Sequence, residues 1–349
     1  MRKYIFLLVA LFVLPFTNTY VQEHVTFTYE QALDMALRDL LFIIDTDIQL
    51  EELQEQRDDL DYELRRMRNW ASSRALDEKR REIAEVDRQM LNLTLQQQQT
   101  KLLRESALRN AMVALNASKF SVYVMEASLT LAEQDLNRAN ARYRHGLIST
   151  NDLRTAQNTF AQAQADMHEL ILDHNTAMQS INHILGQPLH QLTQVEVTDD
   201  TTSYDTRNIA SIITSAPTIR QYQINVDRKH EERRAYEGDD RYVIAELRAA
   251  YERAALERDQ AKTAMEVSIR RVLNEQQNLI QQHDSLLTEL NDAYIAAKNT
   301  QTNLDLGRAT LHDLEQAQLN ILRARQRLNT NANSQWVQIF LLQNPSLLP

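Results

Sequence analysis

The chain has 349 residues with only four glycines, five prolines and no cysteine. So few helix-breaking residues exclude a loop-rich or all-β domain, and the abundance of alanine, leucine, glutamine, arginine and glutamate is typical of long helices and coiled coils. The formal net charge of −10, with both signs mixed along the chain, argues against nucleic acid as a partner. The absence of cysteine excludes disulfides and thiolate metal sites.

The N-terminus carries an export signal. Arg2 and Lys3 precede an apolar run over residues 4–16, and a basic start before about a dozen apolar residues is typical of a secretory signal. The run is short for a membrane span, which needs about 20 apolar residues. Because no small-x-small cleavage site is clear, residues 1–22 are either a signal peptide or an uncleaved N-terminal anchor. We therefore expect an exported protein.

Apolar periodicity predicts helices through almost all of the remaining chain. The expected helices span residues 28–68, 78–145, 151–185, 208–237, 241–306 and 310–342. Turns are expected at 69–77 and 237–240. A segment rich in threonine and aspartate joins the two halves, with a possible short strand at 194–198.

A helix-turn-helix passage occurs twice, about 161 positions apart. In each copy an apolar-periodic helix runs into a single glycine, which can take the left-handed conformation that closes a helix. Three residues later a serine or threonine begins a capping box, with aspartate in place of the usual glutamate. These residues are Gly146, Ser149 and Asp152 in the first copy and Gly307, Thr310 and Asp313 in the second.

Heptad spacing beside the turns predicts tightly packed antiparallel helices. Before the first turn the large residues fall seven apart, at Leu108, Leu115, Val122, Leu129, Leu136 and Tyr143. A helix over 78–145 would span roughly 100 Å, and the helices over 28–68 and 151–185 would each cover about half of it. The predicted fold is therefore all-α, with two repeats of long antiparallel coiled-coil hairpins.

This organisation divides the chain into four parts. They are the signal peptide or anchor at 1–22, the first helical repeat at 23–190 with its tip at 146–152, the linker at 191–207, and the second helical repeat at 208–349 with its tip at 307–313. The linker is expected near the middle of the long helices, at a waist.

The arrangement resembles the TolC family of outer-membrane efflux proteins. The resemblance covers nearly the whole mature chain and is carried by residues 28–37, 142–153, 184–189, 216–219 and 307–314. The second turn is the looser match, since Arg308 and Ala309 follow its glycine. In that family three chains form a hollow twelve-helix barrel, its helical tips engage a periplasmic adaptor of an inner-membrane pump, and a β-barrel pierces the outer membrane.

One departure from the family is large. Family members insert two membrane strands in each half, at the end of the long helix away from the tip, and each strand needs about 9–11 residues. Residues 69–77 and 237–240 have room for a turn only. We therefore expect a barrel-less variant, a TolC-like α-barrel unit that lacks the membrane β-barrel strands.

The resemblance implies a component of an envelope efflux or secretion system and no enzyme. It implies a location in the cell envelope, in the outer membrane, the periplasm or at the extracytoplasmic surface. Its partners would be two further copies of itself in a trimeric conduit, the adaptor (membrane-fusion) protein of an efflux pump, and the cell envelope or a membrane. Adaptor docking would fall on the tips, at Arg142, Arg144, Gly146, Leu147, Ile148, Ser149, Asp152, Gly307, Arg308, Thr310 and Asp313. A non-transport coiled-coil scaffold of the envelope is the alternative.

No catalytic residue, cofactor site or metal site is predicted. His168 and Glu169 begin like a zinc-protease helix, but Leu172 stands where the second histidine must be. His174 and His283 fall on seam rows, where a polar group can set the register. The glutamines at 96–99, 276–277 and 281–282 line either a solvated helix face, the favoured interpretation, or a wet interior.

Overall fold

The computed structural model describes residues 25–38, 40–191, 193–195 and 209–348. The expected signal or anchor at 1–22 and most of the linker at 191–207 lie outside the described residues. The described elements are β1 (Val25–Phe27), α1 (Tyr29–Arg38), α2 (Leu41–Met67), α3 (Ser73–Arg144), α4 (Thr150–Ile184), β2 (Thr193–Val195), α5 (Ile209–Ser215), α6 (Pro217–Ala235), α7 (Arg241–Asp305), α8 (Leu311–Gln343) and the 3₁₀ helix η2 (Pro345–Leu347).

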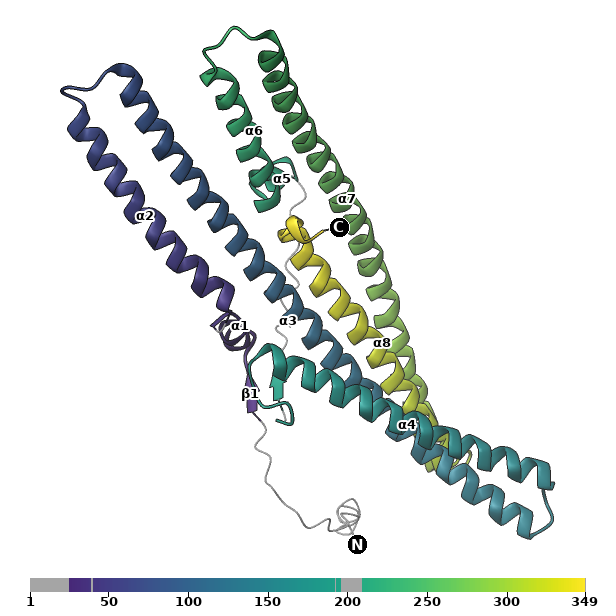
Figure 1. Cartoon of the computed structure of the whole chain (residues 1–349). Coiled ribbons are helices and arrows are strands. Elements are labelled where there is room, and N and C mark those ends of the chain that lie inside the picture. Colours follow the sequence, from purple (N-terminus) through teal and green to yellow (C-terminus); the bar gives the residue numbers. More distant parts are fainter. Residues whose placement is uncertain (1–24, 39, 192, 196–208, 349) are drawn as a thin grey trace.

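Two long helices organise the molecule, and each is flanked by two shorter ones (Figure 1). Helix α3 packs against α2 over one half of its length and α4 over the other, while α7 packs against α6 and α8 in the same way. With 72 residues, α3 is about 110 Å long. It also contacts α6 and α8, so the two halves of the chain meet along it. This confirms the predicted all-α fold of two hairpin repeats.

The helices predicted at 28–68 and 208–237 are each divided in two, so the prediction that they are continuous was wrong. Leu40, between α1 and α2, has extended backbone (φ −76°, ψ 100°). Ala216, between α5 and α6, also has a non-helical backbone (φ −59°, ψ 131°). Pro217 follows it, and a proline clashes with a helical residue directly before it. The apolar periodicity continues across both breaks because the pieces on either side pack against the same long helix.

The ends of the hairpins away from Gly146 and Gly307 are short turns. Residues 68–72 join α2 to α3, and residues 236–240 join α6 to α7. Each connection is shorter than one membrane strand of about 9–11 residues, which confirms the expected lack of inserted strands there. Helix α3 begins five residues earlier than predicted because Ser72 caps it, its hydroxyl accepting a hydrogen bond from the Ala75 amide at 3.3 Å.

The two strands form a small parallel pair at mid-length. Val25, Thr26 and Phe27 lie opposite Thr193, Gln194 and Val195. The strand predicted at 194–198 therefore begins one residue earlier, and its end lies outside the described residues. The pairing joins the segment before α1 to the segment after α4. Gly186, two residues beyond the end of α4, has a positive φ of 65°.

The core is concentrated at the waist, the region around the middle of α3 and α7. One cluster joins α1, α3, α4 and α8, and its buried members are Ala32, Ala36, Leu108, Ala111, Met112, Leu115, Ile181, Leu185 and Trp336. A second joins α5, α6, α7 and α8, with Ile213, Ala216, Ile219, Ile269, Val272 and Leu342. The expected mid-length waist is thus where the chain buries most of its apolar side chains.

Arginine side chains complete the waist. The Arg104 guanidinium donates to the Ala36 carbonyl at 3.1 Å and to the Ile184 carbonyl at 2.8 Å. These carbonyls belong to the last turns of α1 and α4, where backbone acceptors have no partner within the helix and the helix dipole favours a positive charge. One side chain on α3 therefore satisfies the ends of two neighbouring helices.

Arg109 joins the two repeats. Its guanidinium carbon lies 4.6, 4.4 and 4.3 Å from the ring centroids of Tyr29, Trp336 and Phe340, and it pairs with Glu105 at 3.0 Å. The Tyr29 hydroxyl donates to the same carboxylate at 2.6 Å. Burial, and then this hydrogen bond, raise the pKa of the Tyr29 hydroxyl. The cation is enclosed by three aromatic rings, two of them from α8.

Candidate functional site

The first tip, between α3 and α4, is a glycine-closed helix end. Gly146 has a φ of 68°, and its amide donates to the Tyr143 carbonyl at 2.9 Å. The Leu147 amide donates to the Arg142 carbonyl, also at 2.9 Å. This pair of bonds is the Schellman motif, which satisfies the last carbonyls of a helix.

A reciprocal cap opens α4 directly afterwards. The Ser149 amide donates to Asp152 Oδ2 at 3.0 Å, and the Asp152 amide donates to Ser149 Oγ at 3.2 Å. Two amides that the helix leaves unpaired are thereby satisfied. The capping box predicted from the sequence is confirmed.

The second tip, between α7 and α8, repeats this geometry. Gly307 has a φ of 67°, and the Arg308 amide donates to the Asn303 carbonyl at 2.7 Å. The Thr310 amide donates to Asp313 Oδ2 at 2.8 Å, and the Asp313 amide donates to Thr310 Oγ1 at 3.2 Å. The two tips predicted from the sequence repeat therefore share the same pattern of hydrogen bonds.

The tips expose apolar side chains between positive charges. Leu147 is 71% exposed, Arg142, Arg144 and Arg308 are also exposed, and Ile148 is half-buried. Leu306 and Leu311, which were not among the predicted tip residues, are 61% and 59% exposed and flank the second turn. The signal for them in the sequence is an apolar residue directly beside the turn.

The second tip lies against the first repeat. The Arg138 side chain on α3 contacts both Asp135 and the His312 ring, and His312 Nε2 lies 3.7 Å from Asp135 Oδ1. His312 is the neighbour of the capping Asp313. The structure therefore brings the second tip beside α3, a contact between residues too far apart in sequence to predict.

Both capping aspartates have a lowered pKa. For Asp152 the causes are the hydrogen bonds from the Ser149 amide and hydroxyl. For Asp313 they are the equivalent bonds from Thr310, followed by the positive charges of His312 and Arg138. The ionised carboxylates are thus part of the folded tips.

The tips are expected to loosen in acid. Because each carboxyl has a lower pKa folded than unfolded, its stabilisation is complete above the ordinary pKa of about 4 and is lost as the pH falls through the folded pKa. Amide-exchange protection factors at residues 149–153 and 310–314 should therefore fall between pH 6 and pH 3. In the Asp152→Asn, Asp313→Asn protein the protection factors should be lower at pH 6 and should fall less toward pH 3 than in the wild type. An equal pH dependence in both proteins would contradict this account.

The three histidines considered in the sequence differ in their surroundings. His174 Nδ1 lies 3.0 Å from Ser118 Oγ, and burial, followed by the charge of Lys119, lowers the pKa of His174. His283 is half-buried, and His168 is exposed beside an exposed Leu172. Across the part of the chain that the structure describes, no group of three or more His, Cys, Asp or Glu side chains is placed to hold a metal ion.

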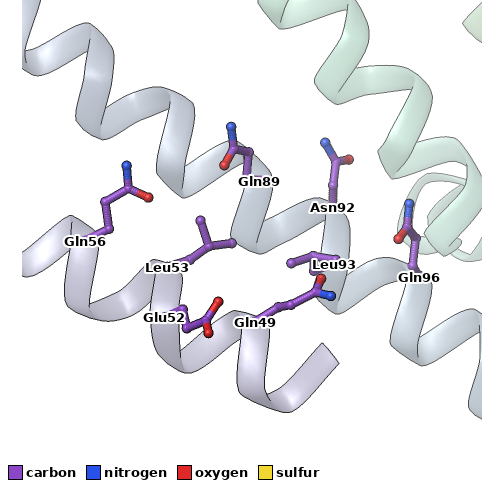
Figure 2. A pocket seen from close by; sticks show the side chains of 8 residues that line it. All are labelled: Gln49, Glu52, Leu53, Gln56, Gln89, Asn92, Leu93 and Gln96. Carbon is purple, nitrogen blue, oxygen red and sulfur yellow. The ribbon is translucent and has the colours of Figure 1, made fainter. Parts of the chain in front are cut away.

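The predicted glutamine run divides between two environments. Gln97 is buried between α2 and α3, where its Nε2 donates to Asp47 Oδ1 at 2.6 Å. Gln96 lines an open groove of about 470 Å³ between the same helices. Figure 2 shows that its side chain points to the same side as those of Gln56, Gln89 and Asn92. The groove is lined by Gln49, Glu52, Leu53, Gln56, Gln89, Asn92, Leu93 and Gln96.

The architecture matches solved structures of outer-membrane channels. The CmeC outer membrane channel of Campylobacter jejuni has a TM-score of 0.67 at 10% identity, with 91% of this chain and 85% of that chain covered. The outer membrane protein VceC from Vibrio cholerae has a TM-score of 0.64 at 11% identity, over 91% and 96%. CusC, whose structures describe transmembrane channel formation, reaches 0.65 at 11% identity, over 96% and 95%. The fold is TolC-like.

The likeness is carried by structure rather than by sequence. No protein-family model matches the chain, and no curated protein sequence matches it. The structural matches nevertheless cover nine-tenths or more of the chain. Among the described helices, none is long and apolar enough to span a membrane.

Proposed function

We propose that the protein is an exported component of an envelope efflux or secretion system. In this proposal it forms a homotrimeric helical conduit whose hairpin tips dock the adaptor (membrane-fusion) protein of a pump. The observation that carries the proposal is the match, over about nine-tenths of the chain, to structures described as an outer membrane channel and an outer membrane protein. Residues 1–22 would direct export, and the repeats at 23–190 and 208–349, joined by 191–207, would build the conduit.

An exposed apolar stripe supports assembly into an oligomer. Ile280, Leu287 and Tyr294 fall seven residues apart on α7, and each is exposed in the single chain. Heptad-spaced apolar residues are the signature of a coiled-coil seam. Here all three remain exposed, although the Arg325 side chain of α8 lies against the Tyr294 ring. A neighbouring copy would supply the missing helix.

The exposed leucines support docking at the tips. Leu147, Leu306 and Leu311 present apolar surface at the end of the molecule, and Arg142, Arg144 and Arg308 surround it with positive charge. A partner with apolar residues at its centre and acidic residues around them would complement this surface. The capping groups of the tips hold the turns in shape for such a contact.

Separate variants test the two contacts. We expect the wild type to have three times the chain mass by light scattering and to bind a membrane-fusion adaptor from the same genome. Ile280→Asp with Leu287→Asp should give monomers. Leu147→Asp with Leu306→Asp and Leu311→Asp should keep the trimer but weaken adaptor binding at least about tenfold.

The same measurements distinguish the alternative function. A wild-type protein that remains monomeric at every concentration and binds no adaptor would overturn the conduit and favour the envelope scaffold. A trimer whose adaptor affinity is unchanged by the three tip substitutions would retain the conduit but remove docking from the tips.

A further inference from the structure

The end of the molecule opposite the tip of α3 and α4 has its own chemistry. This blunt end is formed by the α2–α3 turn at 68–72 and the α6–α7 turn at 236–240, which lie at the same end of the molecule (Figure 1). Neither turn is covered by another described element. The proposed docking at the tips leaves this end without a role.

The first turn of the blunt end is positively charged in a chain whose net charge is −10. Residues 64–76 contain four arginines and neither aspartate nor glutamate. All four are exposed, namely Arg65, Arg66, Arg68 and Arg74. Arg65 pairs with Asp61 at 2.5 Å, whereas the other three form no ion pair within the described residues. The positive charge at this turn is therefore available to an external partner.

Solvent-exposed aromatic side chains lie close to these arginines in the chain. Trp70, within the first turn, is 73% exposed, while the chain's other tryptophan, Trp336, is 6% exposed. Tyr62 is also exposed, and Tyr242 at the second turn is 89% exposed. Tryptophan and tyrosine are enriched where proteins meet the headgroup region of a bilayer, because one part of the ring system is apolar and another can form hydrogen bonds.

We propose that the blunt end binds the surface of a bilayer that contains anionic lipids. Trp70 would enter the headgroup region, and Arg66, Arg68 and Arg74 would contact lipid phosphates. The second turn carries Glu237, Asp239 and Asp240 among its arginines, so we assign it an aromatic contact through Tyr242 and no net electrostatic attraction. The contact is peripheral, and it holds whether the protein is a conduit or a scaffold.

The shape of the surface favours a membrane over a protein partner. Recognition of a peptide or folded segment uses a groove or a sheet edge, whereas Trp70 lies on a projecting five-residue turn between two helix ends. A projecting aromatic group flanked by arginines fits a soft, flat, negatively charged surface.

Vesicle binding by the full chain tests the proposal. Vesicles of phosphatidylcholine alone are compared with vesicles of equal parts phosphatidylcholine and phosphatidylglycerol. At low salt each arginine near an anionic surface contributes about fivefold in affinity. The Arg66→Gln, Arg68→Gln, Arg74→Gln protein should therefore bind the anionic vesicles about 100-fold more weakly, and added salt should weaken the wild type.

A charge-matched control isolates the blunt end. Arg142→Gln with Arg144→Gln and Arg308→Gln removes the same charge from the tips and should change vesicle binding by less than about threefold, since the tips lie far beyond the screening length. The apolar residues 4–16 are present in every protein compared, so their own affinity for lipid cancels. Circular dichroism checks that each variant is folded.

Tryptophan fluorescence provides the second readout. Because Trp336 is buried, a blue shift on vesicle addition and quenching by brominated lipids should come from Trp70 and disappear in Trp70→Phe. Unchanged vesicle affinity in the triple arginine variant, or no quenching of Trp70, would overturn the proposal. Binding of the wild type to polyglutamate but not to anionic vesicles would overturn it too, and would assign the surface to an acidic protein.

Discussion

Replacing Trp336 with alanine is expected to lower the free energy of unfolding by about 3–5 kcal/mol, the usual cost of removing a large buried aromatic side chain. Trp336 packs in the waist cluster, edge-on to Tyr29 at a centroid distance of 5.6 Å and against the Arg109 guanidinium. Because it lies on α8 and its neighbours on α1 and α3, its loss should also weaken the packing of one repeat on the other. Urea unfolding followed by circular dichroism measures the change.

The chain supplies its own control for this substitution. Trp70→Ala removes the same side chain from an exposed turn and should change the unfolding free energy by less than about 0.5 kcal/mol. Trp336→Phe retains an aromatic ring for Arg109, so its free energy of unfolding should lie between those of the two alanine variants. A Trp336→Ala protein as stable as Trp70→Ala would show that the waist does not hold the repeats together.

Replacing Gly146 with valine is expected to destabilise the first tip by about 2 kcal/mol or more. An L-residue in the left-handed conformation costs about 1–2 kcal/mol, and a β-branched residue costs more. A Cβ atom at Gly146 would meet nothing within 4 Å, so the cost would be backbone strain without a steric clash. Limited proteolysis should then cut the Gly146→Val protein near the turn faster than the wild type.

Asparagine separates strain from loss of the glycine. Because asparagine tolerates the left-handed conformation, Gly146→Asn should cost less than about 1 kcal/mol and leave proteolysis near the wild-type rate. Equal resistance of the valine and asparagine variants would mean that the turn accommodates a residue with negative φ, against the Schellman geometry described above.

The local parts of this fold were predictable because their chemistry is local. The positive φ of Gly307 and the cap between Thr310 and Asp313 involve residues within a few positions of each other. The break at Ala216 also had a local signal, the following proline, which the continuing apolar periodicity concealed. The break at Leu40 had none, since no side chain caps α2.

The missed contacts depend on how whole helices lie together. The enclosure of Arg109 by Trp336 and the contact of Arg138 with His312 join residues in different repeats. Periodicity states which face of a helix is apolar, but it does not state the axial position at which two long helices meet. For the same reason the tip residues could be predicted from turn chemistry, whereas the position of the second tip beside α3 could not.

The mid-length location of the core has a mechanical consequence. The buried clusters lie near the centres of α3 and α7, which are about 100 Å long. Each of these helices therefore resembles a lever with two arms of about 50 Å, with its fulcrum at Leu108 in α3 and at Ile269 in α7. A tilt of about 5° at the fulcrum would carry the far end through roughly 4 Å, nearly the rise of one helical turn. Small repacking at the centre is thus amplified into displacement at both extremities.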